Sequence, residues 1–181
     1  MATVAKWSIA DYHKMIAAGI LCDRRIQLID GELIEMSPEG VAHAAYGGSI
    51  VDYLRQVMNG HAWIREAHPI TLSNSEPEPD IAIVQLPKSK YFQSHPIPSD
   101  IYWLVEISDT TLTYDLSKKQ EIYAAAGIPE YWVVDIKNKK LIVFTQPQDS
   151  RYLTKSELTT GTVNPLNFPQ VAISVKQLFA T

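Results

Sequence analysis

Two short apolar runs, at residues 81–84 and 101–107, constrain the fold of this 181-residue chain more than any other feature. Each run is rich in β-branched and aromatic side chains and is bounded by Pro, Asp or Ser, which is typical of strands. Each also carries a carboxylate, since Asp80 stands at the start of the first run and Glu106 lies inside the second. A carboxylate embedded in an apolar strand is costly unless it is paired or binds a metal ion. The pattern therefore indicates an acidic site built on two strands.

A helical pattern follows the second run. Asp115, Lys119 and Tyr123 recur at a spacing of four residues, so they lie on or near one face of a helix. Gly127 and Pro129 end this helix. The apolar residues on the same face predict that it packs on the sheet, which would place Lys119 near the carboxylates rather than in bulk water.

The rest of the chain predicts helices and hairpins around these strands. A helix begins after Ser8, Asp30-Gly31 joins two alternating runs as a β-hairpin, and a long amphipathic helix spans residues 41–58. Further candidate strands lie at 62–67, 69–72, 130–136, 140–145 and 150–158, a long loop at 85–100 and a short helix near 174–179. This order predicts a single domain, residues 1–181, of the α/β or α+β class: a mixed central β-sheet flanked by helices, with an N-terminal helix and β-hairpin.

Charge and composition narrow the functional classes. The formal charge of −4 argues against coating nucleic acid through bulk positive charge, although a local basic patch stays open. The single cysteine, Cys22, excludes an intrachain disulfide. No apolar run approaches the roughly 20 residues that cross a bilayer, and the N-terminus lacks the apolar core of a signal peptide. We therefore expect a cytoplasmic protein with no membrane association.

Two carboxylates beside a lysine suit a hard divalent cation. Mg²⁺ takes oxygen ligands, keeps several waters and is typically held by one or two carboxylates. Such a cation lowers the pKa of a bound water and stabilises charge on a phosphoryl oxygen. A nearby ammonium can orient the attacking water or neutralise charge in the transition state. These residue types point to metal-assisted phosphodiester hydrolysis.

The same residues resemble the PD-(D/E)xK nuclease superfamily, through Pro79-Asp80 and then Glu106 in an apolar strand. In the common form of that superfamily a lysine lies two residues after the acid, where this chain has Ser108. A subset carries the lysine on the following helix, and Lys119 fits that variant. The closer resemblance is to a restriction-endonuclease family of small proteins abundant in cyanobacteria, and it rests on several ordered blocks: residues 30–38, His43, Pro79-Asp80, Glu106, Tyr114-Asp115, Lys119, Tyr123 and residues 127–135.

The resemblance implies a restriction-endonuclease-like core and a role for each matching residue. Asp80 and Glu106 would bind Mg²⁺ or Mn²⁺, and Lys119 would be the catalytic lysine. Glu32 matches a further acidic position that contacts the metal or the water. His43 would lie at the edge of the pocket. DNA would be the substrate, and a homodimer would suit the cleavage of both strands of a duplex.

Simpler interpretations of the same residues stay open. Asp80 is also a common strand-start residue, and Glu106 with Lys119 can be a structural pair. Glu32 after an Asp-Gly turn can face solvent, and Asp115 can be an N-cap or turn acid. Besides the metal-dependent DNA endonuclease, two functions therefore remain: a catalytically inactive interaction protein that keeps the nuclease fold, and a metal-dependent hydrolase of small phosphoesters.

Overall fold

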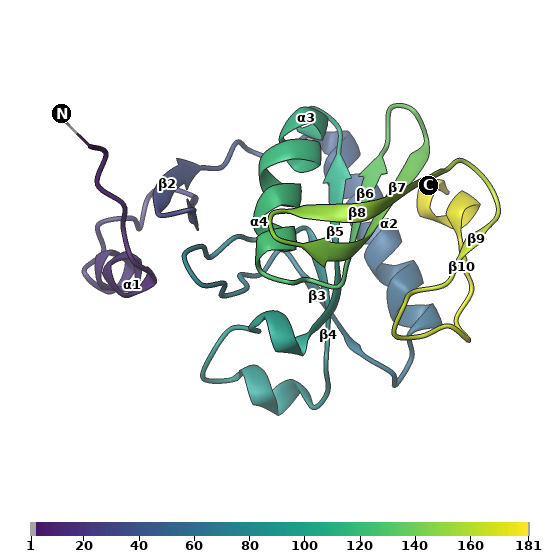
Figure 1. Cartoon of the computed structure of the whole chain (residues 1–181), viewed down its shortest axis with the longest axis horizontal. Coiled ribbons are helices and arrows are strands. Elements are labelled where there is room, and N and C mark those ends of the chain that lie inside the picture. The colour runs from purple at the N-terminus through teal and green to yellow at the C-terminus, as the bar shows by residue number, and fades with distance from the viewer. Residues whose placement is uncertain (1–2, 181) are drawn as a thin grey trace.

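The computed structural model describes residues 3–180 and is built on a six-stranded sheet of order β3-β4-β5-β6-β7-β8 (Figure 1). Only β5 and β6 run parallel, and every other pair of neighbours is antiparallel. The strands are β3 Trp63–Glu66, β4 Ile81–Val84, β5 Ile101–Ser108, β6 Glu130–Asp135, β7 Lys140–Gln148 and β8 Arg151–Leu158. This is the mixed central sheet that the sequence predicts.

Helices cover both faces of the sheet. On one face α2, Val41–Val57, packs Ile50 and Leu54 into an apolar cluster with side chains of the strands. On the other face α4, Gln120–Ala125, contributes Tyr123 to a second cluster. A short helix, α3 Leu112–Tyr114, and a π-helical turn, η3 Asp115–Lys119, lead into α4. The helix predicted around Lys119 is therefore confirmed, with a widened turn in its middle.

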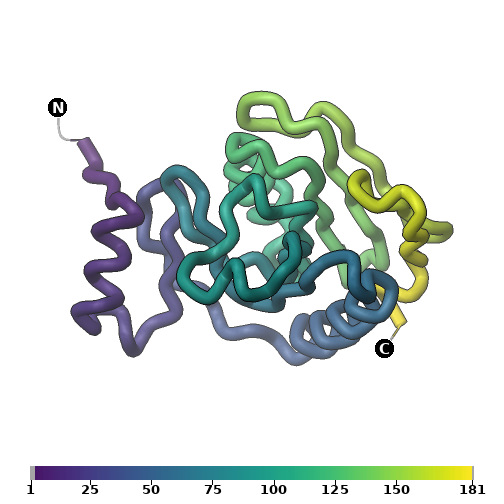
Figure 2. Tube along the Cα trace, turned by 90° about the horizontal axis from the view of Figure 1, so that it is seen from below, coloured from purple at the N-terminus to yellow at the C-terminus, as the bar shows by residue number. Residues whose placement is uncertain are grey.

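The N-terminal helix and hairpin lie beside the sheet, as Figures 1 and 2 show. They comprise α1 Ile9–Ala17, β1 Ile26–Ile29 and β2 Glu32–Glu35. The hairpin turn places both Asp30 (φ 50°) and Gly31 (φ 71°) in the left-handed region, as a tight Asp-Gly turn requires. A cap on α1 and this turn were both predictable from local sequence, and both are confirmed.

The remaining elements are short. β9 and β10 form a small two-stranded sheet, and the described part of the chain also contains three 3₁₀ helices. Their bounds are η1 Lys88–Tyr91, η2 Pro98–Asp100, β9 Thr162–Val163, β10 Ile173–Ser174 and η4 Val175–Phe179. Within residues 3–180, no helix combines the length and apolar character that crossing a bilayer requires.

The strand predicted at residues 69–72 is wrong. Ile70 and Leu72 are buried, which explains their apolar pattern, but they fill the core from an irregular segment. The amide of Leu72 bonds to Ser75 across a turn at 2.9 Å, and the amide of Thr71 bonds to Pro96 in the long loop at 2.9 Å. Because these hydrogen bonds go to a turn and to a loop, the segment adds no strand to the sheet.

Candidate active site

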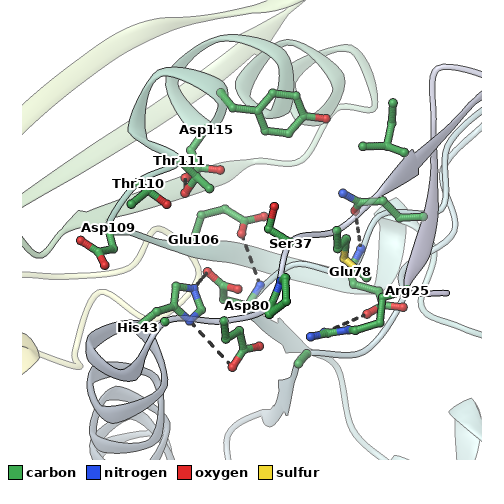
Figure 3. A pocket seen from close by; sticks show the side chains of 18 of the residues that line it. Arg25, Ser37, His43, Glu78, Asp80, Glu106, Asp109, Thr110, Thr111 and Asp115 are labelled. Carbon is green, nitrogen blue, oxygen red and sulfur yellow. Dashed lines mark hydrogen bonds and ion pairs between the residues drawn. The ribbon is translucent and has the colours of Figure 1, made fainter.

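A pocket of about 500 Å³ opens beside the end of β5 (Figure 3). Six parts of the chain line it: the hairpin with its flanking residues, the first turn of α2, Ala67 just after β3, the residues just before β4, the end of β5 with the turn after it, and the helical segment that ends in η3. Four of the predicted site residues line this pocket, namely His43, Asp80, Glu106 and Lys119.

Strand register brings the two acids together. β4 and β5 are antiparallel, and Ile81 pairs with Val105, so Asp80 comes to lie next to Glu106. The amide of Asp80 donates to Oε2 of Glu106 at 3.4 Å. The pairing of β4 with β5 therefore brings together two acids that are 26 residues apart in the sequence.

Glu106 is buried, with 1% of its surface exposed, and both of its carboxylate oxygens accept hydrogen bonds. Tyr123 donates to Oε1 at 2.7 Å, and Nζ of Lys119 lies 2.7 Å from Oε2. Burial raises the pKa of Glu106 above its ordinary range, although the charge of Lys119 opposes this rise. The carboxylate inside the apolar strand is therefore tolerated because an ammonium and a hydroxyl satisfy it.

Asp80 lies at the start of β4 and faces the pocket. Its Oδ2 accepts from the amide of Ile107 at 2.6 Å and is 3.0 Å from Nε2 of His43. Burial alone would raise the pKa of Asp80, but the hydrogen bond with His43 and the charge of Lys119 outweigh it and lower the pKa below its usual range. Asp80 is therefore ionised at neutral pH.

Lys119 is the last residue of the π-helical turn, and its side chain points toward the carboxylates of Glu106 and Asp115. Its residue exposure is 8%, and its Nζ lies 2.7 Å from Glu106 and 3.9 Å from Oδ1 of Asp115. Burial would lower the pKa of Lys119, but the surrounding carboxylates reverse this and raise it. The neighbouring Lys118 instead pairs with Asp30 on the hairpin at 3.2 Å. The two adjacent lysines thus make different contacts, because successive residues of a helix point in different directions.

His43, in the first turn of α2, connects that helix to the acid pair. Its hydrogen bond with Asp80 raises the pKa of the imidazole above its ordinary range. Nδ1 of His43 is buried and, within residues 3–180, has no hydrogen-bond partner, while Glu39 lies 4.0 Å away. His43 lines the pocket, and a role for it in the site stays a prediction.

The structure does not bring Glu32 to this pocket. Glu32 begins β2, its side chain is 53% exposed, and its Oε1 lies 2.8 Å from Nζ of Lys6. The metal or catalytic role suggested for Glu32 by family resemblance therefore has no support from its position. It stays a prediction.

Asp115 and Glu78 also line the pocket, although the sequence analysis does not predict them as site residues. Asp115 is 2% exposed and lies inside the helical segment, so the N-cap interpretation of it is wrong. Glu78 lines the pocket, and burial raises its pKa. The available signals were the spacing of four between Asp115 and Lys119, and the alternation of Glu78 with Asp80 ahead of the strand.

The donor set of the pocket fits a hard divalent cation held by few protein ligands. Within residues 3–180, no three His, Cys, Asp or Glu side chains gather as a metal-binding group. Asp80 lines the pocket, and both described hydrogen bonds to its side chain are made by Oδ2, which leaves Oδ1 available. Because Mg²⁺ keeps waters and commonly uses one or two carboxylates, and Mn²⁺ shares its preference for oxygen ligands, Asp80 and Glu106 would be the residues that hold the ion.

The mixed six-stranded sheet with helices on both faces defines a class of fold, the restriction-endonuclease-like fold. A crystal structure described as a putative nuclease belonging to DUF820, from Anabaena variabilis ATCC 29413, superposes with a TM-score of 0.64. The match covers 85% of this chain and 89% of that one at 18% identity, which shows the shared fold.

A family model then makes the assignment specific. The Uma2 model, described as "Putative restriction endonuclease", matches residues 9–176, and the chain belongs to this family. No curated protein matches the chain. The resemblance drawn from the sequence blocks is thereby confirmed.

Proposed function

We propose that this chain is a Mg²⁺- or Mn²⁺-dependent endonuclease that hydrolyses DNA phosphodiester bonds. The observation that carries the proposal is the buried ammonium of Lys119, 2.7 Å from Glu106 and in the same pocket as Asp80. Membership of a family whose model is described as "Putative restriction endonuclease" supports the choice of reaction. Two carboxylates and one ammonium facing a pocket are the groups that such a hydrolysis needs.

Each residue has a distinct part in this proposal. A bound divalent cation lowers the pKa of a water and neutralises charge on the phosphoryl oxygens. Asp80 is ionised and would hold the cation together with Glu106, while His43 keeps Asp80 in place. Lys119 stays protonated, so its ammonium can stabilise the negative charge that develops on the phosphate.

Cleavage of supercoiled plasmid DNA in Mg²⁺ or Mn²⁺ tests the proposal. We expect Asp80→Asn and Lys119→Ala each to lower the cleavage rate by about 10²-fold or more, the scale on which a preorganised charge acts in catalysis. Lys118→Ala is the matched control, because that adjacent lysine pairs with the hairpin residue Asp30 rather than with the site. EDTA should abolish cleavage by the wild type. Cleavage that persists in both site variants would reject this assignment.

The same preparation separates the two other functions. Isothermal titration with Mg²⁺ that shows no binding, together with intact plasmid, would favour a non-catalytic interaction protein. Hydrolysis of nucleotides without cleavage of polymers would favour a hydrolase of small phosphoesters, which a pocket of about 500 Å³ could also accommodate.

We also propose that two copies act together, because a two-fold symmetric pair presents one site to each strand of a duplex. Sedimentation velocity should then show a dimer, and plasmid should be linearised without a long-lived nicked form. A monomer that only nicks would contradict the dimer and leave the nuclease proposal in place.

A further inference from the structure

We propose that Asp115, held by Ser108 and Thr111, is the positioning residue for Lys119. This inference rests on the proposed function, since it concerns the ammonium of the same site. Asp115 would not touch the substrate or the metal. It would fix where the lysine amine stands.

The carboxylate of Asp115 is immobilised by two hydroxyls. Oγ of Ser108 donates to its Oδ2 at 2.7 Å, and Oγ1 of Thr111 donates to the same oxygen at 2.6 Å. The residue is 2% exposed, so solvent offers no alternative partner for this oxygen. The other oxygen, Oδ1, lies 3.9 Å from Nζ of Lys119. One side of the carboxylate is therefore anchored while the other faces the ammonium.

The ammonium of Lys119 lies between two buried carboxylates. Glu106 contacts it directly at 2.7 Å, and Asp115 holds it from one helical turn away. A lysine side chain has four rotatable bonds, so a single ion pair leaves its amine several ways to reach the partner. A second fixed carboxylate removes most of these arrangements. Without it, we expect the amine to leave the position from which it can meet a phosphate.

The backbone of the same turn is also fixed to the sheet. Asp115 and Lys119 are the first and last residues of η3. Such π-helical turns are rare in proteins as a whole, but many of those that occur lie at functional sites. Tyr131, in β6, donates its hydroxyl to the carbonyl of Asp115 at 3.1 Å. Asp115 thus ties the widened turn to the sheet through its main chain and steers Lys119 through its side chain.

Ser108 anchors Asp115 from the same strand that carries Glu106. It lies two residues after Glu106 on β5, so the two side chains share a face of the sheet. This is the position where the common superfamily pattern has its lysine. A serine at this place is small, buried and able to donate, and it uses its proton on Asp115. The strand position that lacks the lysine therefore supports the acid that holds the helix lysine.

The first readout is the NH₃⁺ signal of Lys119 in ¹H–¹⁵N spectra of the metal-free protein at one fixed pH. Buried, hydrogen-bonded ammonium groups exchange slowly enough to be seen, and Lys119→Ala assigns the signal. We expect Asp115→Asn to shift it or broaden it beyond detection. Asp135→Asn is the matched control: Asp135 is another buried acid, on β6 opposite Ser108, and its carboxylate accepts from Asn138 at 3.0 and 2.8 Å.

The second readout is cleavage kinetics. Partners that orient metal ligands typically matter by about 10–100-fold. We expect a comparable fall in kcat for Asp115→Asn, with KM nearly unchanged. Ser108→Thr, which keeps the donor, should retain more activity than Ser108→Ala. If Asp115→Asn does not fold, the pair Ser108→Ala and Thr111→Val keeps the carboxylate while freeing it, and the same Lys119 signal is measured.

The outcomes separate this inference from the proposed function. An unchanged Lys119 signal in folded Asp115→Asn overturns the positioning role, even if the wild type cleaves DNA. If Asp115→Asn perturbs the Lys119 signal but the wild type cleaves no DNA, the contact is upheld and the nuclease is rejected. A perturbed signal together with a loss of kcat upholds both.

Discussion

The contact between His43 and Asp80 makes the stability of the fold depend on pH in a defined direction. Nε2 of His43 lies 3.0 Å from Oδ2 of Asp80, and the two side chains are 19% and 22% exposed. Replacing His43 by Asn removes the ionisable ring and leaves the amide of Ile107 as the remaining donor to this oxygen.

The magnitude follows from the type of contact. A hydrogen bond to a charged group contributes about 1.5–3 kcal/mol to the free energy of unfolding. Both side chains keep about a fifth of their surface in water, and solvent screening then places the value near the lower limit, at about 1.5 kcal/mol. We therefore expect the free energy of unfolding of His43→Asn at pH 5.5 to be about 1.5 kcal/mol below that of the wild type.

The sign of the pH dependence comes from the two pKa shifts. The pKa of His43 is raised above its ordinary 6.5, mainly by Asp80, so its contribution is fully present below pH 6.5 and is lost as the pH rises through the raised value. The pKa of Asp80 is lowered below 3.8, so its contribution is present above pH 3.8 and is lost as the pH falls through the lowered value. The stabilisation should therefore be greatest between these limits.

Urea unfolding of the wild type and of His43→Asn, in EDTA at pH 5.5, 7.0 and 8.5, measures this difference. We expect it to be largest at pH 5.5 and to shrink toward pH 8.5. His61→Asn, an exposed histidine beyond the end of α2, is the control and should show no such trend. A difference that is constant across the three pH values, or that grows toward pH 8.5, would refute the reasoning.

Three further predictions concern the hydrogen bond to the strand acid, the hairpin turn and the lysine position. Tyr123→Phe should lower the free energy of unfolding by about 1.5–3 kcal/mol, because the Tyr123 hydroxyl donates to a buried carboxylate at 2.7 Å. Tyr152→Phe loses a 2.9 Å hydrogen bond to a carbonyl and should lower it by about 1 kcal/mol. Urea unfolding of the two variants compares these losses. Gly31→Ala should cost about 1–3 kcal/mol by thermal unfolding, since φ is +71° and the added methyl would come within 2.8 Å of another side chain; an unchanged Tm would contradict this. Introducing Ser108→Lys into the Lys119→Ala variant should raise plasmid cleavage by about tenfold, because the new amine would enter the same acidic space. No recovery in the folded double variant would show that the two lysine positions are not equivalent.

Local sequence determined most of the elements that carry the site. The apolar runs form β4 and β5, the Asp30-Gly31 turn forms the hairpin, and the spacing of four places Asp115 and Lys119 on one helical turn. Each of these follows from side-chain periodicity or from a turn residue with an unusual backbone angle, and both act within a few residues. A buried acid in β5 also required a partner, which made Lys119 a reasonable candidate before any geometry was known.

Only the tertiary structure decided which side chains meet. His43 joins Asp80 across 37 residues, and Tyr123 joins Glu106 across 17. Glu32, although part of a specific sequence block, pairs with Lys6 in solvent instead of joining the acids. The physical reason is that periodicity specifies which face a residue occupies, whereas the approach of two faces depends on strand register and on packing between distant segments.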